Sequence, residues 1–240
     1  MHPSARPVYY GVVFAWYMFF FYGNAYSLAN LDKSRIPTGP FNPFYGSQWK
    51  YLSFLNVVLQ AFFYAISLLT SAFILMKKRR IATTMISFKD LIFSSLVFPL
   101  STFVFATFWS IYLYDRNLIY PKYMDSIIPE WINHGMHTLV FLLALVEMFV
   151  IPHQYPSVGK SLSILGVLIL AYLLWILYFF AKTGKWLYPI FKFLSPLGMI
   201  VFSGIAAVTV FFYYMLGRFL NRMIWGDTVP VHDVHKKKCK

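Results

Sequence analysis

The sequence predicts an all-α membrane protein, a bundle of six transmembrane helices with both termini in the cytosol. Only 12% of its 240 residues are charged and 59% are hydrophobic, whereas a soluble domain has about 25% charged residues. Six apolar stretches reach the length of about 20 residues that a helix needs to cross a bilayer. Short loops separate them, so residues 1–240 are expected to form a single polytopic membrane domain.

The six stretches are uniform enough to favour helices over strands. Five contain no charged residue, and the fourth contains one, Glu147. Transmembrane barrels use alternating segments of about 10 residues, which these stretches do not resemble. Helices satisfy every backbone polar group within the segment, as lipid requires. The expected spans cover about residues 8–31, 51–76, 91–114, 131–152, 161–181 and 193–217.

The distribution of lysine and arginine predicts the orientation of the bundle. With both termini inside, the cytosolic segments carry more of these residues than the opposite side, mainly in the run 77–80 and the basic tail 218–240. Such an excess is typical of cytosolic loops. Because the basic residues lie between apolar stretches and not on one soluble face, the net charge of +13 does not indicate nucleic-acid binding.

The C-terminal tail also suggests a location. Lys237 and Lys238 are fourth and third from the end, the spacing of a dilysine retrieval signal for the endoplasmic reticulum. The alternative is a solvated basic tail that is attracted to anionic lipid. Both interpretations place the tail in the cytosol. The single cysteine, Cys239, excludes a disulfide framework and a cysteine-ligated zinc site.

Polar residues inside spans are informative, since positions that face lipid should be apolar. In the second span, Ser53, Asn56 and Gln60 are spaced i, i+3 and i+7 and share one helix face. In the fourth span, His134 and His137 are expected to share a face, with a glycine between them that lets a partner approach closely. Both spans start on the non-cytosolic side, so the two clusters should lie at similar depth.

A serine hydroxyl and an imidazole at one depth could form a nucleophile and its base. The alternative is that these polar groups serve only helix packing. His134 and His137 could also supply two zinc ligands, and acidic residues in the preceding loop keep a zinc hydrolase open as an alternative. We expect no metal and no organic cofactor.

Other polar residues have less specific interpretations. Arg116 could bind a carboxylate, or it could anchor the interface while paired with Asp115. Either Asp115 or Asn133 could orient His137, and the sequence does not select between them. Glu147 lies about 15 Å deeper in the membrane than His137, and we expect it to be protonated or paired near the far interface. His153 is expected in a loop at that opposite end.

Four stretches of the chain, taken in order, look familiar. They are 46–54 (GSQWKYLSF), 108–122 with its YDR and IYPK segments, 133–138 (NHGMHT) and 153–157 (HQYPS). Together they resemble the androgen-induced/androgen-dependent TFPI-regulating family, and the likeness extends from about residue 46 to residue 225.

The resemblance implies an enzyme. The family comprises multipass hydrolases that cleave fatty acid esters of hydroxy fatty acids with a nucleophilic threonine and a histidine. These align with Ser53 and His137. Serine keeps the hydroxyl and loses the methyl group that stiffens the threonine side chain. The family position three residues further on is commonly acidic, and here it is Asn56.

The expected mechanism needs further groups around the pair. Lys50 or Arg116 could hold a free carboxylate of the substrate, and Asn133 or His134 could stabilise the oxyanion. The expected partners are bilayer lipid and a fatty-acyl ester. The alternative from another class is a non-catalytic lipid-binding or regulatory membrane protein. A transporter is disfavoured because the chain shows no internal repeat and has only one ionisable residue deep in a span.

Overall fold

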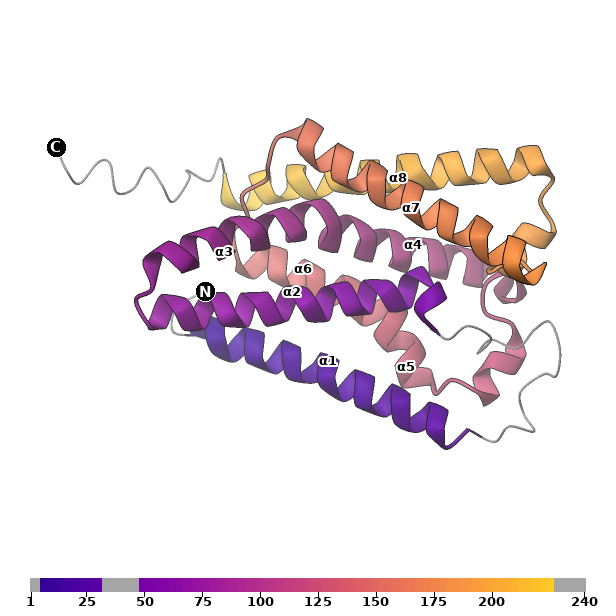
Figure 1. The fold of residues 1–240 in the computed structure, drawn as a ribbon, viewed down its shortest axis with the longest axis horizontal. Coiled ribbons are helices and arrows are strands. Elements are labelled where there is room, and N and C mark those ends of the chain that lie inside the picture. The colour runs from indigo at the N-terminus through magenta and orange to yellow at the C-terminus, as the bar shows by residue number, and fades with distance from the viewer. Residues whose placement is uncertain (1–4, 32–47, 227–240) are drawn as a thin grey trace.

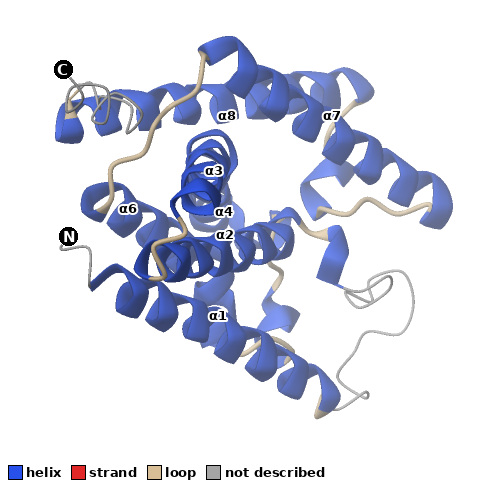
Figure 2. Cartoon of the chain, turned by 60° about the vertical axis from the view of Figure 1, so that its left-hand side comes forward, coloured by secondary structure: helices blue, strands red, loops and turns tan. Residues whose placement is uncertain are grey.

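A computed structural model describes residues 5–31 and 48–226, and within these ranges the chain is helical and contains no β-strand (Figure 1; Figure 2). The predicted all-α class is confirmed for this part of the chain. The α-helices are α1 (Arg6–Ala29), α2 (Leu52–Leu75), α3 (Arg79–Ile92), α4 (Phe98–Asp115), α5 (Glu130–His134), α6 (Val140–Val150), α7 (Val158–Thr183) and α8 (Pro196–Trp225). Lys237, Lys238 and Cys239 lie outside the described residues.

Two π-helical turns join neighbouring elements into longer helices. The turn Phe93–Val97 links α3 to α4, so that one helix runs through Arg79–Leu118 over 40 residues. The turn Gly135–Leu139 links α5 to α6 in the same way. At 1.5 Å per residue the first helix is about 60 Å long, roughly twice the apolar thickness of a bilayer. The span expected at 91–114 is therefore the later part of a longer helix, whose first part carries the charges of the expected loop.

Five helices in the described ranges combine the length and the hydropathy of a membrane span. They are Leu52–Leu75, Arg79–Leu118, Glu130–Val150, Val158–Thr183 and Pro196–Trp225. The helix α1 forms as expected, but it is not among these five, because several tyrosines and Asn24 lower its hydropathy. The number of six spans and the cytosolic location of both termini therefore stay predictions.

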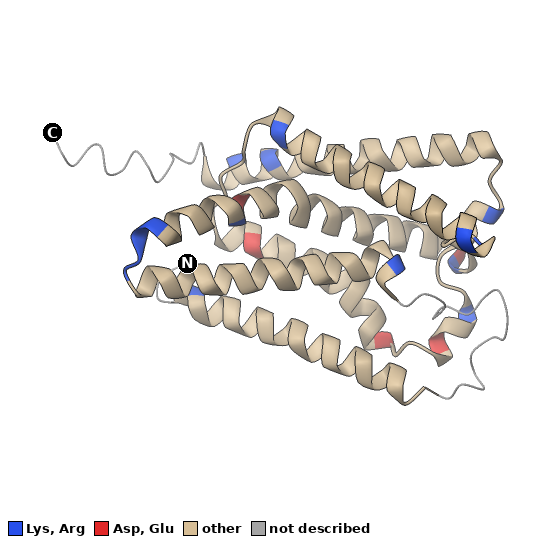
Figure 3. Cartoon of the chain, viewed as in Figure 1, with Lys and Arg blue, Asp and Glu red and all other residues tan. Residues whose placement is uncertain are grey.

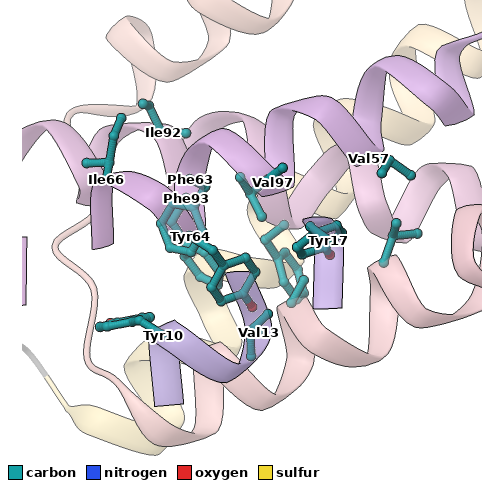
Figure 4. Close-up of a cluster of buried hydrophobic side chains, with 14 of the residues drawn as sticks. Tyr10, Val13, Tyr17, Val57, Phe63, Tyr64, Ile66, Ile92, Phe93 and Val97 are labelled. Atoms are coloured by element: carbon teal, nitrogen blue, oxygen red, sulfur yellow. The ribbon is translucent and has the colours of Figure 1, made fainter. Parts of the chain in front are cut away.

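An aromatic core holds α1, α2 and the helix α3–α4 together (Figure 4). The rings of Tyr17 and Tyr64 stack with their centroids 5.8 Å apart. Phe63 packs on Phe93 with a centroid distance of 5.5 Å. By contrast, the outward faces of α7 and α8 expose large apolar side chains such as Leu170, as expected for helices that contact lipid.

The bundle has two ends, and each contains a cavity. The first, here called the Ser53 end, holds the start of α2, the end of α4, helix α5 and the connection between α7 and α8 (Figure 1). The second, the Arg6 end, holds the start of α1, the turn between α2 and α3, and the loop 151–157. Basic side chains gather at that turn (Figure 3).

Candidate active site

The Ser53 end contains an apolar cavity of about 310 Å³, lined by α2, α4, α7 and α8. Ser53 from α2 and His137 from the turn Gly135–Leu139 both line it. Most other lining side chains are aliphatic or aromatic, and they include Phe108 and Phe179. The fold thus brings to one cavity the hydroxyl and the imidazole that the sequence places at one depth.

Ser53 is the second residue of α2 and is half-buried. The N–H of the first residue, Leu52, donates to the Tyr172 hydroxyl at 2.9 Å and to the Tyr188 hydroxyl at 3.3 Å. These two hydroxyls are 2.7 Å apart. The first N–H groups of a helix have no partner within the helix, so the tyrosine pair supplies one. It fixes the start of α2, and with it Ser53, against α7.

His137 is buried and held in one orientation. Its Nδ1 lies 2.9 Å from Oδ1 and 3.0 Å from the backbone oxygen of Asn133. A backbone carbonyl only accepts hydrogen bonds, so this network assigns the proton to Nδ1. The ring stacks on Phe108 with a centroid distance of 3.6 Å and an interplanar angle of 11°. The neutral imidazole therefore keeps Nε2 unprotonated, as a general base requires.

In the part of the chain that the structure describes, no hydrogen bond joins the Ser53 hydroxyl to His137. Catalytic hydrogen bonds are often long in the free enzyme and tighten when substrate binds.

The turn that carries His137 is itself held close to α1. A Cβ on Gly135 would lie 2.7 Å from the ring of Phe20, so the close approach expected at this glycine is confirmed.

Three polar residues that the sequence associates with the pair lie outside the cavity wall. Asn56 is buried, and its Oδ1 accepts a hydrogen bond from Ser101 at 3.3 Å. His134 is partly exposed, with its Nδ1 3.0 Å from the Thr138 hydroxyl. Asn133 lies behind the imidazole that it orients. Neither Asn133 nor His134 reaches the wall where an oxyanion would form.

Arg116 has a different partner from the one expected. Its Nη2 donates to Asp125 at 2.6 Å, and its Nε donates to the backbone oxygen of Tyr120 at 3.2 Å. The expected pairing with Asp115 is wrong, because that carboxylate accepts from the backbone N–H of Asn117 at 2.9 Å and caps a short 3-10 turn. Neither Arg116 nor Asp115 lines the cavity, and Asp115 does not contact the candidate base.

Lys50 is the sequence-predicted cation that does line the cavity. It ends the 3-10 turn Gln48–Lys50, just before α2, and only 3% of its surface is exposed. Its ammonium lies 5.2 Å from the ring centroid of Tyr51 and 5.0 Å from that of Phe179. Burial lowers the pKa of Lys50 to about 8, because the charged form loses its water.

The connection between α7 and α8 also lines the cavity, which the sequence did not predict. Lys185, Trp186, Tyr188 and Lys192 all line it. In the sequence these residues read as an ordinary interfacial loop, where lysines and aromatic residues are common. No motif marks them, so only the fold reveals that this loop covers the cavity.

Within residues 5–31 and 48–226, no group of three or more His, Cys, Asp or Glu side chains converges as the ligands of a metal ion would. The zinc alternative suggested by His134 and His137 thus finds no third protein ligand in the described chain.

The helices and the cavity define a helical membrane protein with an internal apolar site. The chain belongs to the FAR-17a/AIG1-like family, whose model matches residues 5–222. It is 39% identical to the androgen-dependent TFPI-regulating protein of Homo sapiens, over 95% of this chain and 96% of that protein. It is also 39% identical to the androgen-induced gene 1 protein of Homo sapiens, over 84% of this chain and 87% of that protein.

A more distant relative is also described as a membrane protein. A UPF0641 membrane protein of Schizosaccharomyces pombe is 27% identical over 72% of this chain and 74% of its own length. The resemblance found in the sequence is therefore confirmed at the level of the family. No solved structure matches the chain.

Proposed function

We propose that this protein is an intramembrane hydrolase that cleaves the ester bond of fatty acid esters of hydroxy fatty acids. Ser53 is the nucleophile and His137 the base. The proposal depends on one observation above all, that these two side chains line the same apolar cavity. The substrate class comes from the resemblance to the androgen-induced/androgen-dependent TFPI-regulating family.

The chemistry proceeds through an acyl-enzyme. His137 Nε2 takes the Ser53 proton while Ser53 Oγ attacks the ester carbonyl carbon. The tetrahedral intermediate collapses, and the proton on Nε2 passes to the leaving alkoxide, which departs as the hydroxy fatty acid. Water then gives a proton to Nε2 and attacks the acyl-serine. Collapse of the second intermediate returns the proton to Ser53 Oγ and releases the fatty acid.

The cavity suits such a substrate in polarity. Its aliphatic and aromatic walls can receive acyl chains, while a small number of polar groups orient the ester, as in most ligand sites. A fatty acid ester of a hydroxy fatty acid also carries a free carboxylate. Lys50 lines the cavity and is the cation proposed for that group, whereas Arg116 does not line the cavity.

Labelling with a fluorophosphonate tests the nucleophile. The purified protein is labelled, and the adduct is mapped by mass spectrometry in wild type, Ser53→Ala, His137→Ala and Ser203→Ala. Ser203 lines the same cavity from α8 and is the matched control. The proposal expects an adduct on Ser53 that disappears in His137→Ala and persists in Ser203→Ala. An adduct on Ser203, or none on folded wild type, would contradict it.

A second candidate function is lipid binding without catalysis. The observation that favours it is that, among the described residues, no hydrogen bond joins Ser53 to His137 in a cavity that is mostly apolar. In that case lipid would copurify with the protein, and fluorophosphonate would label neither serine. Ser53→Ala and His137→Ala would then change thermal stability alone, since there would be no turnover to lose.

We also propose that Lys237 and Lys238 retain the protein in the endoplasmic reticulum. Replacing both with alanine is expected to move a tagged protein to later secretory compartments, which immunofluorescence detects. Protease protection of tags at each terminus would test the cytosolic orientation that such a signal needs. An unchanged distribution of the double variant would contradict the retrieval role.

A further inference from the structure

A second cavity, of about 270 Å³, lies at the Arg6 end, away from Ser53 and His137. It is lined by the start of α1, the last turns of α2, α3 and the loop that follows α6. Its polar lining includes Arg6, Ser67, Lys89 and Asp90. The proposed hydrolase uses none of these residues, so this cavity needs its own explanation.

Two hydrogen-bond donors of this cavity are buried without a partner. Among the described residues, neither Arg6 Nε nor Ser67 Oγ has a hydrogen-bond partner, and Ser67 is 0% exposed. The neighbouring hydroxyls behave differently, because Thr70 donates to the oxygen of Ile66 at 2.7 Å and Ser71 donates to that of Ser67 at 2.9 Å. Buried polar groups in proteins are normally satisfied. These two donors are therefore suited to an acceptor that enters the cavity.

A buried cluster of ionisable groups lies behind the cavity. His153 was expected in a loop, and it does follow α6 outside any helix, but it is fully buried. Its Nδ1 lies 2.9 Å from Asp90 Oδ1, and its Nε2 lies 3.2 Å from Glu147 Oε1. Tyr10 donates to the same oxygen of Glu147 at 3.0 Å, and Lys89 Nζ lies 4.0 Å from it. Glu147 is thus paired, as one of the two expected states.

The charged side chains that line the cavity are two cations, Arg6 and Lys89, and one carboxylate, Asp90. Lys89 lies 4.0 Å from Glu147, and Asp90 contacts His153, so both belong to the cluster behind the cavity. Arg6 is the cation of the lining that lies outside this cluster, and its Nε is buried without a hydrogen-bond partner among the described residues.

We infer that this cavity binds a phosphate group, in the headgroup of a phospholipid or in a soluble phosphate. The guanidinium of Arg6 and the hydroxyl of Ser67 are donors suited to phosphate oxygens. The basic turn 77–80 lies at the same end and raises the local concentration of anions (Figure 3). The cavity is larger than a phosphate ion, which leaves room for the glycerol or alcohol part of a headgroup.

Native mass spectrometry of the full-length protein in detergent tests the site with three probes. They are dihexanoyl phosphatidylglycerol, inorganic phosphate and dihexanoyl glycerol, which lacks the phosphate. The variants are Arg6→Gln, Ser67→Ala and, as matched control, Lys78→Gln. Lys78 is an exposed cation at the same end that does not line the cavity. Ser67→Ala removes a hydroxyl that has no partner, so it probes the site in a protein that folds.

The site predicts one equivalent of the phospholipid bound, with an affinity at least tenfold lower in Arg6→Gln, several-fold lower in Ser67→Ala and changed less than twofold in Lys78→Gln. Displacement by millimolar inorganic phosphate would identify the ligand as a soluble phosphate. If the phospholipid stays bound in millimolar inorganic phosphate, the ligand is the lipid headgroup. Equal binding of dihexanoyl glycerol, or equal losses in Arg6→Gln and Lys78→Gln, would overturn the inference.

Discussion

The side-chain oxygen and the backbone oxygen of Asn133 both lie within 3.0 Å of Nδ1 of His137, one helical turn away. Two acceptors on one nitrogen hold the imidazole in a single tautomer and a single orientation, with Phe108 stacked against its face. Under the proposed function, Asn133 would do for His137 what an acidic residue does in many nucleophile–base pairs, and it would do so without adding a buried charge. We expect its role to be positioning, since it does not line the cavity.

Asn133→Ala tests that role. The variant keeps the backbone acceptor and loses the side-chain acceptor, so we expect kcat to fall about fivefold to tenfold with KM unchanged, since one hydrogen bond contributes about 1 kcal/mol. Steady-state kinetics on a defined ester would measure kcat and KM separately. Asn117→Ala is the control, because Asn117 is exposed and bonds only within its own turn. A rise in KM with constant kcat would argue for substrate binding instead.

Two substitutions at Ser53 test the proposed nucleophile. Ser53→Ala is expected to lower turnover by about a thousandfold or more, because it removes the attacking oxygen. Ser53→Thr keeps that oxygen and should retain measurable activity. Hydrolysis assays on protein of equal thermal stability make the comparison. Equal loss in both variants would indicate that the side chain serves packing and not attack.

Lys50 is expected to give the proposed reaction a pH dependence with a definite sign. Its pKa is lowered to about 8, so its positive charge is present below that pH and is lost as the pH rises through it. For a substrate with a free carboxylate, we expect KM to rise above about pH 8. Lys50→Arg should keep KM low at higher pH, since a guanidinium stays charged.

Two controls separate this effect from others. The methyl ester of the same substrate has no carboxylate, so its KM should not follow the Lys50 titration. Arg116→Gln should leave KM unchanged, because Arg116 is paired with Asp125 outside the cavity. If Arg116→Gln raises KM and Lys50→Gln does not, the carboxylate is bound by the other cation.

Gly135→Ala probes the contact between the histidine-bearing turn and α1. The added Cβ would lie 2.7 Å from the Phe20 ring, so the ring or the helix that carries it must shift. We expect a destabilisation of about 1–3 kcal/mol, in the range of overpacked cores. Gly166→Ala is the matched control within α7, because a Cβ there meets nothing within 4 Å and alanine favours the helix. Thermal unfolding in one detergent compares the two, and equal midpoints would contradict the close contact.

Sequence reasoning reached the helices and the placement of Ser53 and His137 along one cavity, because both follow from apolar length and from the parity of the spans. It could not foresee the π-helical turn Gly135–Leu139. Spacing i, i+3 in an α-helix places His134 and His137 on one face, and both rings do stack on α4, against Trp109 and Phe108, but only His137 lines the cavity. No residue pattern in a single sequence marks such a turn.

Long-range pairings were also beyond the sequence. Asp90, Glu147 and His153 come from a helix, a second helix and a loop, and nothing in their spacing predicts that they meet. Likewise, adjacency favoured Asp115 as the partner of Arg116, whereas the fold of the loop brings Asp125 to it. The end of a helix could be estimated from composition, but the path of the chain beyond it could not.

The bonds from Leu52 to Tyr172 and Tyr188 attach the start of α2 to α7 and to the loop that follows it. These same elements wall one side of the cavity. Under the proposed function, a lipid that entered through that side would have to displace them, and an outward movement of α7 would also break the bonds that hold the residue before Ser53. The entry path of the substrate and the position of the proposed nucleophile would then depend on the same contact.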